Sequence, residues 1–255
     1  MSRVHLQIAG RVAELRLDNP DRLNAFTVTM LSQLAEHLDR IEKTPDIACV
    51  LVTAEPARAF CSGADIEGWG DLTPAEFARD WVRGGHRVFD RLARLARPTI
   101  AVLEAHALGG GLEFAAACDL RVMGVKATIG LPETGIGIVP GWSGTQRLAR
   151  LLPEPVLKEM ALFGRRISAE RCLALGFAAD VSDSPRAAAD EMAARASALS
   201  PRAVETAKSM IHAAVNEDAG AMIEALGSAA VAASADRAEG VGAFRDKRRP
   251  EFSGT

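Results

Sequence analysis

Segments with strand patterns and segments with helix patterns alternate along the N-terminal part of this chain. Apolar and polar residues alternate over Val4–Ile8 and Val12–Leu17, on either side of Ala9-Gly10, which predicts a hairpin of two strands. Apolar residues at three- and four-residue spacing then predict a helix over Thr27–Lys43, and the β-branched run Ile47–Thr53 predicts a buried strand. Because strands joined through helices form crossover units, this order favours an α/β fold with a largely parallel sheet.

The alternation continues, and helical patterns then take over. Phe77–Leu95 predicts a helix, Thr99–Leu103 a strand, Gly110–Ala117 a short helix and Leu120–Met123 a strand. After Gly144 the sequence is rich in Ala, Leu, Glu and Arg, and we expect this region to be helical throughout. Its predicted helices are Thr145–Leu152, Pro155–Phe163, Ala169–Leu175, Ala187–Leu199, Pro201–Val215 and Ala219–Ala235. We expect residues 1–190 to form the core and residues 191–255 a helical C-terminal region.

The composition is typical of a globular protein with one sizeable core. Of the 255 residues, 48% are hydrophobic and 25% are charged, and the formal net charge of −3 offers no broad basic surface for nucleic acid. No apolar stretch approaches the ~20 residues that a membrane-spanning helix needs. The 4 cysteines show no CxxC spacing and Met1–Gly10 lacks an apolar signal core, so we expect a cytoplasmic protein.

Two glycine-bearing segments have the features of a catalytic site. Gly109–Gly111 precedes Glu113 inside an apolar run, and a carboxylate in such a place is costly unless it is paired, protonated or used in chemistry. The segment Phe60–Ile66 is predicted to be a loop after the strand Ile47–Thr53, at the carboxyl end where α/β sheets bind ligands. We therefore expect the two segments to meet at one crevice, although either one alone is also compatible with a tight turn.

The same residues also allow structural roles and other motifs. Without the glycine context, Glu113 would be read as a buried ion-pair partner and Glu133 as a solvated turn residue. The spacing Gly135-x-Gly137-x-x-Pro140 lacks the third glycine of a dinucleotide fingerprint, and Gly141–Thr145 places its second glycine one residue too early for a GxSxG elbow. The histidines lie far apart and form no HExxH, so no metal is expected.

The segment Leu131–Leu148, taken with the two glycine segments, resembles the crotonase, or enoyl-CoA hydratase/isomerase, superfamily. The resemblance covers nearly the whole chain in matching order and spacing. Its matching segments are Asn24-Ala25, Ala59–Ile66, Ala101–Asp119, Ala127–Leu148, Arg166–Ala169 and Phe244–Phe252. It implies an α/β, crotonase-like fold of repeated ββα units with a helical C-terminal trimerisation region, and often hexamers built from two trimers.

The resemblance also implies a chemistry. The substrates would be acyl-CoA thioesters, whose thioester oxygen accepts hydrogen bonds from the backbone amides of Ala64 and Gly110, the oxyanion hole. Glu113 would activate water and Glu133 would protonate the α-carbon, as in members that hydrate 2-enoyl-CoA thioesters. We therefore expect an enoyl-CoA hydratase, a lyase without a cofactor, since coenzyme A is part of the substrate. A Δ3-Δ2 enoyl-CoA isomerase, or another acyl-CoA reaction of the superfamily, is the alternative.

The same resemblance implies further contacts with the substrate. The candidate residues are Arg58, Ser62, Asp65, Ile66, Gly109, Gly141, Trp142, Phe244 and Lys247. Arg58 stands where relatives often carry a lysine, a tolerable change because a guanidinium group also binds phosphate. Phe244 and Lys247 match residues that reach CoA across a subunit interface in relatives, with a solvated tail as an equal alternative. Trp142 stands where many relatives carry small residues, and it either packs in the core or shapes the acyl pocket.

A reading from another functional class stays open. A fold does not secure a function, and a scaffold or RNA-binding member would keep this fold without useful catalysis. The basic cluster Lys247–Arg249 favours that reading, whereas the two glutamates, the two glycine segments and the lack of excess positive charge count against it. We expect a homotrimer or homohexamer that binds an acyl-CoA thioester and has neither nucleic acid nor membrane as a partner.

Overall fold

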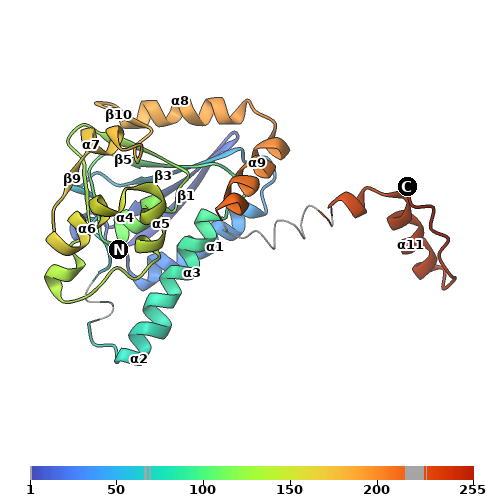
Figure 1. The fold of residues 1–255 in the computed structure, drawn as a ribbon, viewed down its shortest axis with the longest axis horizontal. Helices are drawn as coiled ribbons and strands as arrows, with labels where there is room; N and C mark the ends of the chain where they lie inside the picture. Colours follow the sequence, from blue (N-terminus) through green and yellow to red (C-terminus); the bar gives the residue numbers. More distant parts are fainter. Residues whose placement is uncertain (1, 66–67, 69, 216–226, 228) are drawn as a thin grey trace. The chain divides into compact units, whose positions relative to one another are not determined.

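A six-stranded sheet organises the first part of the chain. In the computed structural model, which describes residues 2–65, 68, 70–215, 227 and 229–255, its strand order is β1-β2-β3-β5-β7-β10 (Figure 1). These strands are β1 (Arg3–Ala9), β2 (Val12–Asp18), β3 (Cys49–Ala54), β5 (Thr99–Leu103), β7 (Leu120–Gly124) and β10 (Asp180–Ser182). β1 and β2 form the predicted antiparallel hairpin, and the other neighbours pair in parallel, which confirms the α/β class.

A smaller sheet of four strands accompanies the first. Its order is β4-β6-β8-β9, and the strands are β4 (Ala59–Cys61), β6 (His106–Leu108), β8 (Thr128–Gly130) and β9 (Ile167–Ser168). β4, β6 and β8 each follow a strand of the large sheet and precede a helical segment. This recurrence is the ββα repeat that the resemblance implies.

Most helices form where apolar spacing predicts them. α1 (Val28–Glu42) begins after Thr27, whose hydroxyl accepts the Met30 amide. The other helical segments of this region include α2 (Pro74–Glu76), the π-helical segment η3 (Phe77–Val82), α3 (Arg83–Ala93), α4 (Gly110–Ala116), α5 (Gly144–Leu151), α6 (Glu154–Phe163), α7 (Ala169–Ala174) and α8 (Pro185–Ser197). The predicted helix Phe77–Leu95 therefore consists of η3 and α3. No helix in the described ranges combines the length and apolar character needed to cross a bilayer.

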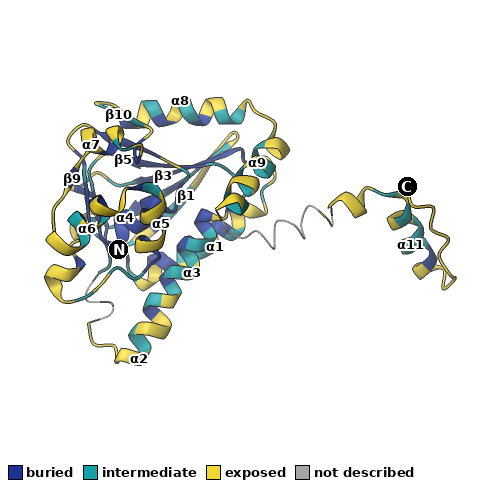
Figure 2. Ribbon diagram, in the orientation of Figure 1, coloured by how far each residue is buried: buried dark blue, intermediate teal, exposed yellow. Residues whose placement is uncertain are grey.

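Helices cover both faces of the large sheet, because successive strand residues point to opposite faces. Leu51 of β3 packs with Ala189 and Ala193 of α8 in one cluster. Its neighbour Val50 lies in the larger cluster, which contains buried residues of α1, α3 and α4. Figure 2 shows the strands buried between helices whose outer faces are exposed.

Two expectations from the sequence are wrong. The region after Gly144 is not helical throughout, because β9 and β10 lie within it. These strands have 2 and 3 residues, too few to show an alternating pattern. In addition, Phe60 and Cys61 do not lie in a loop after β3, since they belong to β4 and the glycine turn follows the smaller sheet.

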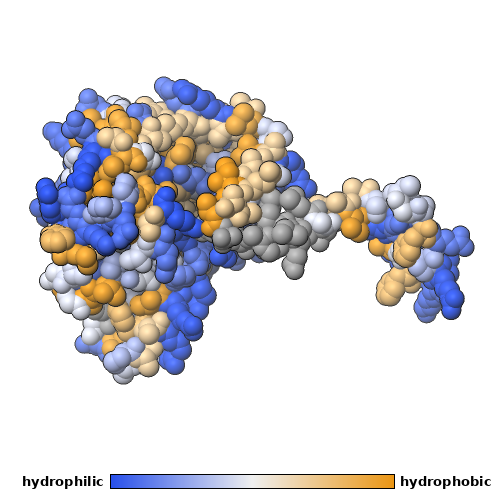
Figure 3. Space-filling view, in the orientation of Figure 1, coloured by the Kyte–Doolittle hydropathy of each residue, from blue (hydrophilic) through white to orange (hydrophobic). Residues whose placement is uncertain are grey.

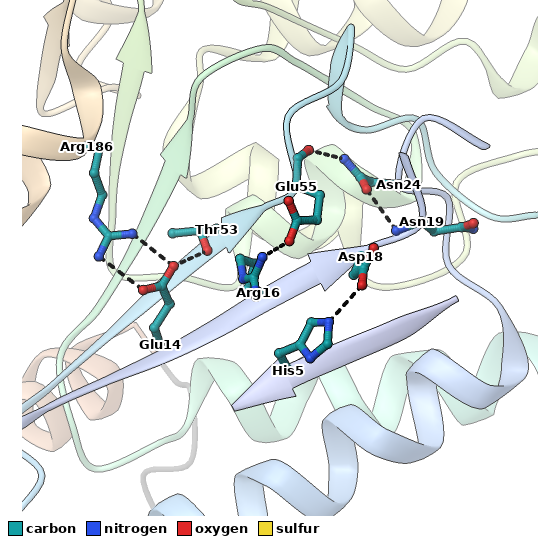
Figure 4. Close-up of polar contacts among 9 residues, drawn as sticks. All are labelled: His5, Glu14, Arg16, Asp18, Asn19, Asn24, Thr53, Glu55 and Arg186. Carbon is teal, nitrogen blue, oxygen red and sulfur yellow. Dashed lines mark hydrogen bonds and ion pairs between the residues drawn. The ribbon is translucent and has the colours of Figure 1, made fainter. Parts of the chain in front are cut away.

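A buried asparagine fixes the chain that leads from the hairpin to α1 (Figure 4). Asn24 donates hydrogen bonds to the carbonyls of Glu55 at 2.9 Å and Ala59 at 3.1 Å. Its side-chain oxygen accepts the amide of Asn19 at 3.0 Å. These bonds satisfy a fully buried amide group and hold Phe26, two residues later, beside the turn after β4.

An ion pair ties α8 to the sheet on the opposite face (Figure 4). Arg186 contacts both carboxylate oxygens of Glu14 on β2, at 2.9 and 3.0 Å. Thr53 of β3 donates a hydrogen bond to the same carboxylate at 2.7 Å. The bidentate geometry gives α8 a defined position along the strands.

The chain divides into two compact units, Met1–Val204 and Glu205–Thr255. α9 (Pro201–Ala214) runs into the second unit, and α11 (Ala235–Arg245) begins after Ser234, whose hydroxyl accepts the Arg237 amide. Most of the predicted helix Ala219–Ala235 lies outside the described residues. Figure 3 shows apolar side chains at the surface over α9, and the exposed large apolar residues of this unit include Met210, Ile211, Val215, Val231, Val241, Phe244 and Phe252.

Candidate active site

The N-terminus of α4 forms one wall of the candidate site. Gly109, the residue before the helix, has a φ of 53°, a left-handed conformation that favours glycine. A Cβ atom at this position would also lie only 2.9 Å from Oε1 of Glu133. The first amides of a helix have no partner within it, so the amide of Gly110 is a donor that the helix itself does not use.

The turn after β4 lies against this helix start. The amide of Phe26 donates to the carbonyl of Gly63, and the amide of Asp65 donates to the carbonyl of Phe26, both at 2.8 Å. Ala64 lies between these two bonded residues in an extended chain, so its own amide points to the opposite side. A Cβ atom on Gly63 would lie 3.3 Å from the Gly110 nitrogen. The structure thus brings together the two glycine segments that the sequence singled out.

Glu113 lies one turn into α4 with its carboxylate held by backbone amides. Its side chain is buried, and Oε1 accepts the amides of Trp142 and Gly144, both at 2.8 Å. Burial raises the pKa of Glu113, whereas these amides act in the opposite direction because they stabilise the carboxylate. A methyl group on Gly144 would overlap this carboxylate, so glycine is required there.

Glu133 begins the short helix η4 (Glu133–Ile136) and lies in a less polar environment. It is buried, and its Oε2 has no hydrogen-bond partner among the described residues. Burial raises the pKa of Glu133 to about 7, and the nearby charge of Glu113 adds to the rise. This carboxyl group therefore exchanges its proton near neutral pH.

Both glutamates line one cavity of about 210 Å³, together with Ala64 and Gly110. The remaining wall is mainly apolar. Its large apolar members are Phe77, Trp81, Val82, Ile136, Ile138, Val139 and Trp142. Two backbone amides and two carboxyl groups thus face a small, largely apolar space, an arrangement suited to stabilising an enolate and to moving protons.

The other residues named from the sequence fall into four groups. Ser62, Gly109, Gly141 and Trp142 line the cavity. Arg58 is exposed before β4, and Asp65 is half-buried, 3.9 Å from Arg22, so neither belongs to the lining. Ile66 lies outside the described residues. Phe244 and Lys247 are exposed residues of the unit Glu205–Thr255 and stay predictions.

Trp142 packs tightly between two helices. Its indole is buried and occupies the space that a Cβ atom on Gly85 of α3 or on Gly110 of α4 would need. Its ring N–H donates to the carbonyl of Trp81 at 3.3 Å, and the two indole rings lie 5.2 Å apart. Trp142 therefore packs in the core and also lines the cavity, and its contact with an acyl group stays a prediction.

Sequence reasoning missed a polar network behind Glu113. Ser143 Oγ hydrogen-bonds to Nδ1 of His86 at 2.8 Å, and Nε2 of His86 lies 3.0 Å from Asp90. Asp90 also forms an ion pair with Arg147 of α5, which is buried and whose charge lowers the pKa of Glu113. In the sequence, the four-residue spacing of His86 and Asp90 on a predicted helix could have indicated that these two side chains contact each other.

The network supports the turn that holds Glu113. Ser143 has a φ of 71° and stands between the two residues whose amides bind the Glu113 carboxylate.

No group of three or more His, Cys, Asp or Glu side chains in the described part of the chain is placed to hold a metal ion.

Comparison with known proteins gives matches over nearly the full length. Residues 7–255 match the family described as enoyl-CoA hydratase/isomerase. The putative enoyl-CoA hydratase/isomerase YngF of Bacillus subtilis is 37% identical over 249 residues, which cover 95% of each chain. The 2,3-dehydroadipyl-CoA hydratase of Escherichia coli is 34% identical over 258 residues, covering 100% of both. The crystal structure of an enoyl-CoA hydratase from Bacillus anthracis superposes with a TM-score of 0.81 at 30% identity, covering 99% of each chain.

Proposed function

This chain belongs to the enoyl-CoA hydratase/isomerase family, and we propose that it hydrates 2-enoyl-CoA thioesters to 3-hydroxyacyl-CoA thioesters. The observation that carries the proposal is the presence of two buried carboxyl groups, Glu113 and Glu133, in one small cavity beside the amides of Ala64 and Gly110. Hydration needs a base for water and an acid for carbon, and this pair can provide both. The hydratase names of several relatives support the same reaction class.

In the proposed reaction the amides of Ala64 and Gly110 bind the thioester oxygen. Addition at the β-carbon converts the thioester into an enolate, whose oxygen carries more negative charge than the carbonyl oxygen did. Fixed amide donors bind that oxygen more strongly than the carbonyl and so lower the barrier. Because both donors belong to the backbone, no polar side chain is needed at residue 64 or 110 to bind this oxygen.

The two glutamates have different roles in the proton transfers. Glu113, held as a carboxylate by the amides of Trp142 and Gly144, takes a proton from water while the water oxygen bonds to the β-carbon. Glu133, with its pKa raised to about 7, gives its proton to the α-carbon as the enolate collapses. The product contains one added water, and one proton must pass from Glu113 to Glu133 before the next turnover.

The proposal includes the binding partners and the assembly. Arg58, Ser62, Asp65, Gly109, Gly141 and Trp142 would contact the CoA thioester, with Ile66, Phe244 and Lys247 as further predicted contacts. No cofactor is required beyond the coenzyme A of the substrate. We place the protein in the cytoplasm as a homotrimer or homohexamer, without nucleic acid or membrane as a partner. The exposed apolar residues of the unit Glu205–Thr255 support self-association.

Replacement of either glutamate by glutamine tests the mechanism. We expect Glu113→Gln and Glu133→Gln each to lower kcat for crotonyl-CoA by about 10²- to 10⁴-fold, the usual contribution of a general acid or base. The dissociation constant of butyryl-CoA, measured by calorimetry, should change little because neither carboxylate is proposed to bind the CoA moiety. Glu170→Gln, on the exposed surface of α7, is the matched control and should keep wild-type turnover.

Two results would contradict this assignment. Wild-type turnover in both active-site variants would remove the glutamates from the mechanism. Migration of the double bond without addition of water would instead identify an isomerase in the same pocket.

A further inference from the structure

A second, larger cavity lies beside the candidate active site. It has a volume of about 510 Å³ and runs between α1 and α3. Its wall is mostly apolar on the α1 side, where Val28, Leu31 and Ala35 face it, and Leu72 and Val88 line it from the opposite side. We call this cavity the α1–α3 groove. Asp80, Arg87 and Arg91 also line the groove, so the apolar α1 side is the part that suits a hydrocarbon chain.

Trp81 separates the groove from the catalytic cavity. Among the described residues, it alone lines both spaces. Its side chain is only 5% exposed, so the indole fills the space between them. Removal of one large buried side chain opens a volume on the order of 150 Å³ or more, which would connect the two cavities.

The position of Trp81 is fixed by its helix and by a second tryptophan. Trp81 lies in η3, where the π-helical turn interrupts the regular bonding pattern of the α-helix. Its carbonyl accepts the indole N–H of Trp142 at 3.3 Å, and the two rings pack with centroids 5.2 Å apart. The wall is therefore built into the core and is not a loose surface side chain.

The volumes indicate what each side can hold. At roughly 30 Å³ for a water-sized group, the catalytic cavity of about 210 Å³ holds about seven such groups. A thioester carbonyl with a tail of about four to six carbons fills that space. The α1–α3 groove, at about 510 Å³, has room for about seventeen more groups, enough for the remainder of a long acyl chain.

We propose that Trp81 is the residue that determines acyl-chain length: it restricts the pocket to short acyl groups, and without it the pocket opens into the α1–α3 groove. This inference rests on the proposed function in that it names the acyl group of the same thioester substrate. The groove in the wild-type protein is thus closed to the acyl chain by one side chain.

A chain-length series tests the proposal. We would measure kcat/KM for 2-enoyl-CoA thioesters of 4 to 12 carbons, and binding of the matching saturated acyl-CoA thioesters by calorimetry, with wild-type protein and Trp81→Ala. Wild type should lose activity and affinity beyond about six carbons. In Trp81→Ala, each methylene that enters the groove should improve binding by about fourfold, so that the ten-carbon chain, with about four methylenes in the groove, binds about 250-fold more tightly than the four-carbon one.

Two further variants keep the test decisive. Trp81→Leu makes a smaller opening and should show a smaller shift in the same direction, even if Trp81→Ala folds poorly. Leu72→Trp narrows the groove away from the catalytic cavity. In the Trp81→Ala background it should restore the short-chain profile, and alone it should leave crotonyl-CoA hydration unchanged.

The outcomes separate this proposal from the proposed function. Equal binding and turnover of four- and twelve-carbon thioesters by wild type would overturn the role of Trp81, as would unchanged chain-length profiles in both Trp81 variants. A shifted binding profile without hydration of any thioester would support Trp81 as the wall and contradict the hydratase assignment.

Discussion

Glu113 and Glu133 line the same cavity in different surroundings. Burial raises the pKa of Glu113, and two backbone amides at 2.8 Å and the charge of Arg147 oppose that rise because they stabilise the carboxylate. Glu133 Oε2 has no hydrogen-bond partner in the described parts of the chain, and burial raises the pKa of Glu133 to about 7. The difference arises from the surroundings, since both side chains are buried. This difference in surroundings supports the proposed roles of Glu113 as base and Glu133 as acid.

The raised pKa of Glu133 predicts a pH-dependent cost to stability. Below about pH 4.5 the group is protonated in both the folded and unfolded states, so it adds nothing to the pH dependence of the free energy of unfolding. As the pH rises toward about 7, the unfolded state releases its proton first, so the folded state becomes relatively less stable. Glu133→Gln removes this effect, and its stability advantage over wild type should grow by roughly 3 kcal/mol between pH 4.5 and pH 8.

Urea denaturation at several pH values measures this difference. Glu170→Gln is the control for removal of a carboxylate from the surface, and its difference from wild type should not follow the same curve. A stability difference between Glu133→Gln and wild type that stays constant with pH would show that Glu133 does not hold its proton near neutrality.

Glu113 and Glu133 could be named as candidate site residues from the sequence, because glycines and apolar neighbours surround them in an order that resembles a known family. The structure places both in one cavity. It did not predict the network of His86, Asp90, Ser143 and Arg147. That network joins α3 to α5, and its contacts depend on tertiary packing. Only the four-residue spacing of His86 and Asp90 within one helix was visible beforehand.

Among the secondary-structure elements, the segment formed by η3 and α3 packs closely against the buried Trp142. Periodicity predicted one helix over Phe77–Leu95, and it could not show the π-helical segment η3, because that segment has only 6 residues. The small strands β4, β6, β8 and β9 escaped prediction for a related reason, since each has only two or three residues. Long, strongly periodic elements such as α1 were predicted to within one residue at each end.

Adjacent glycines on α3 give a matched test of this packing. A methyl group on Gly85 would overlap the indole of Trp142, whereas a methyl group on Gly84 would meet nothing within 4 Å. We expect Gly85→Ala to destabilise the protein by about 1–3 kcal/mol, the usual cost of overpacking. Gly84→Ala should be neutral or stabilising by up to about 1 kcal/mol, because alanine favours the helix.

Thermal and urea unfolding of both variants measure the contrast. Equal stability of Gly85→Ala and Gly84→Ala would contradict the placement of Trp142 between α3 and α4. A large loss in Gly85→Ala alone would support it, and with it the rigidity of the wall that Trp81 and Trp142 form.

At the scale of the whole molecule, the unit Glu205–Thr255 has little core of its own. Ala243 is the buried hydrophobic residue of its described part, while Phe244 is 86% exposed and Phe252 is 63% exposed. A segment of this size with so much exposed apolar surface gains stability when it is covered by another surface. The sequence predicted a helical C-terminal region, although the described helix α11 was not among the predicted elements.

Self-association is the expected consequence. The monomer mass is 27.0 kDa, so a trimer has about 81 kDa and a hexamer about 162 kDa, as three and six times that value. Sedimentation equilibrium should give one of these masses at micromolar concentration. Phe244→Ser should lower the association constant if this side chain is covered in the assembly. A 27.0 kDa species at all concentrations would contradict the proposed oligomer.

The reaction proposed for this protein is the addition of water to an enoyl thioester. Its most direct test is incubation of the wild-type protein with crotonyl-CoA in water enriched in oxygen-18, followed by mass spectrometry of the thioesters. We predict 3-hydroxybutyryl-CoA that carries one oxygen-18 atom at the β-carbon. Crotonyl-CoA that stays unconverted, a shifted double bond without added water, or free coenzyme A with a labelled acid would each contradict the proposed hydration.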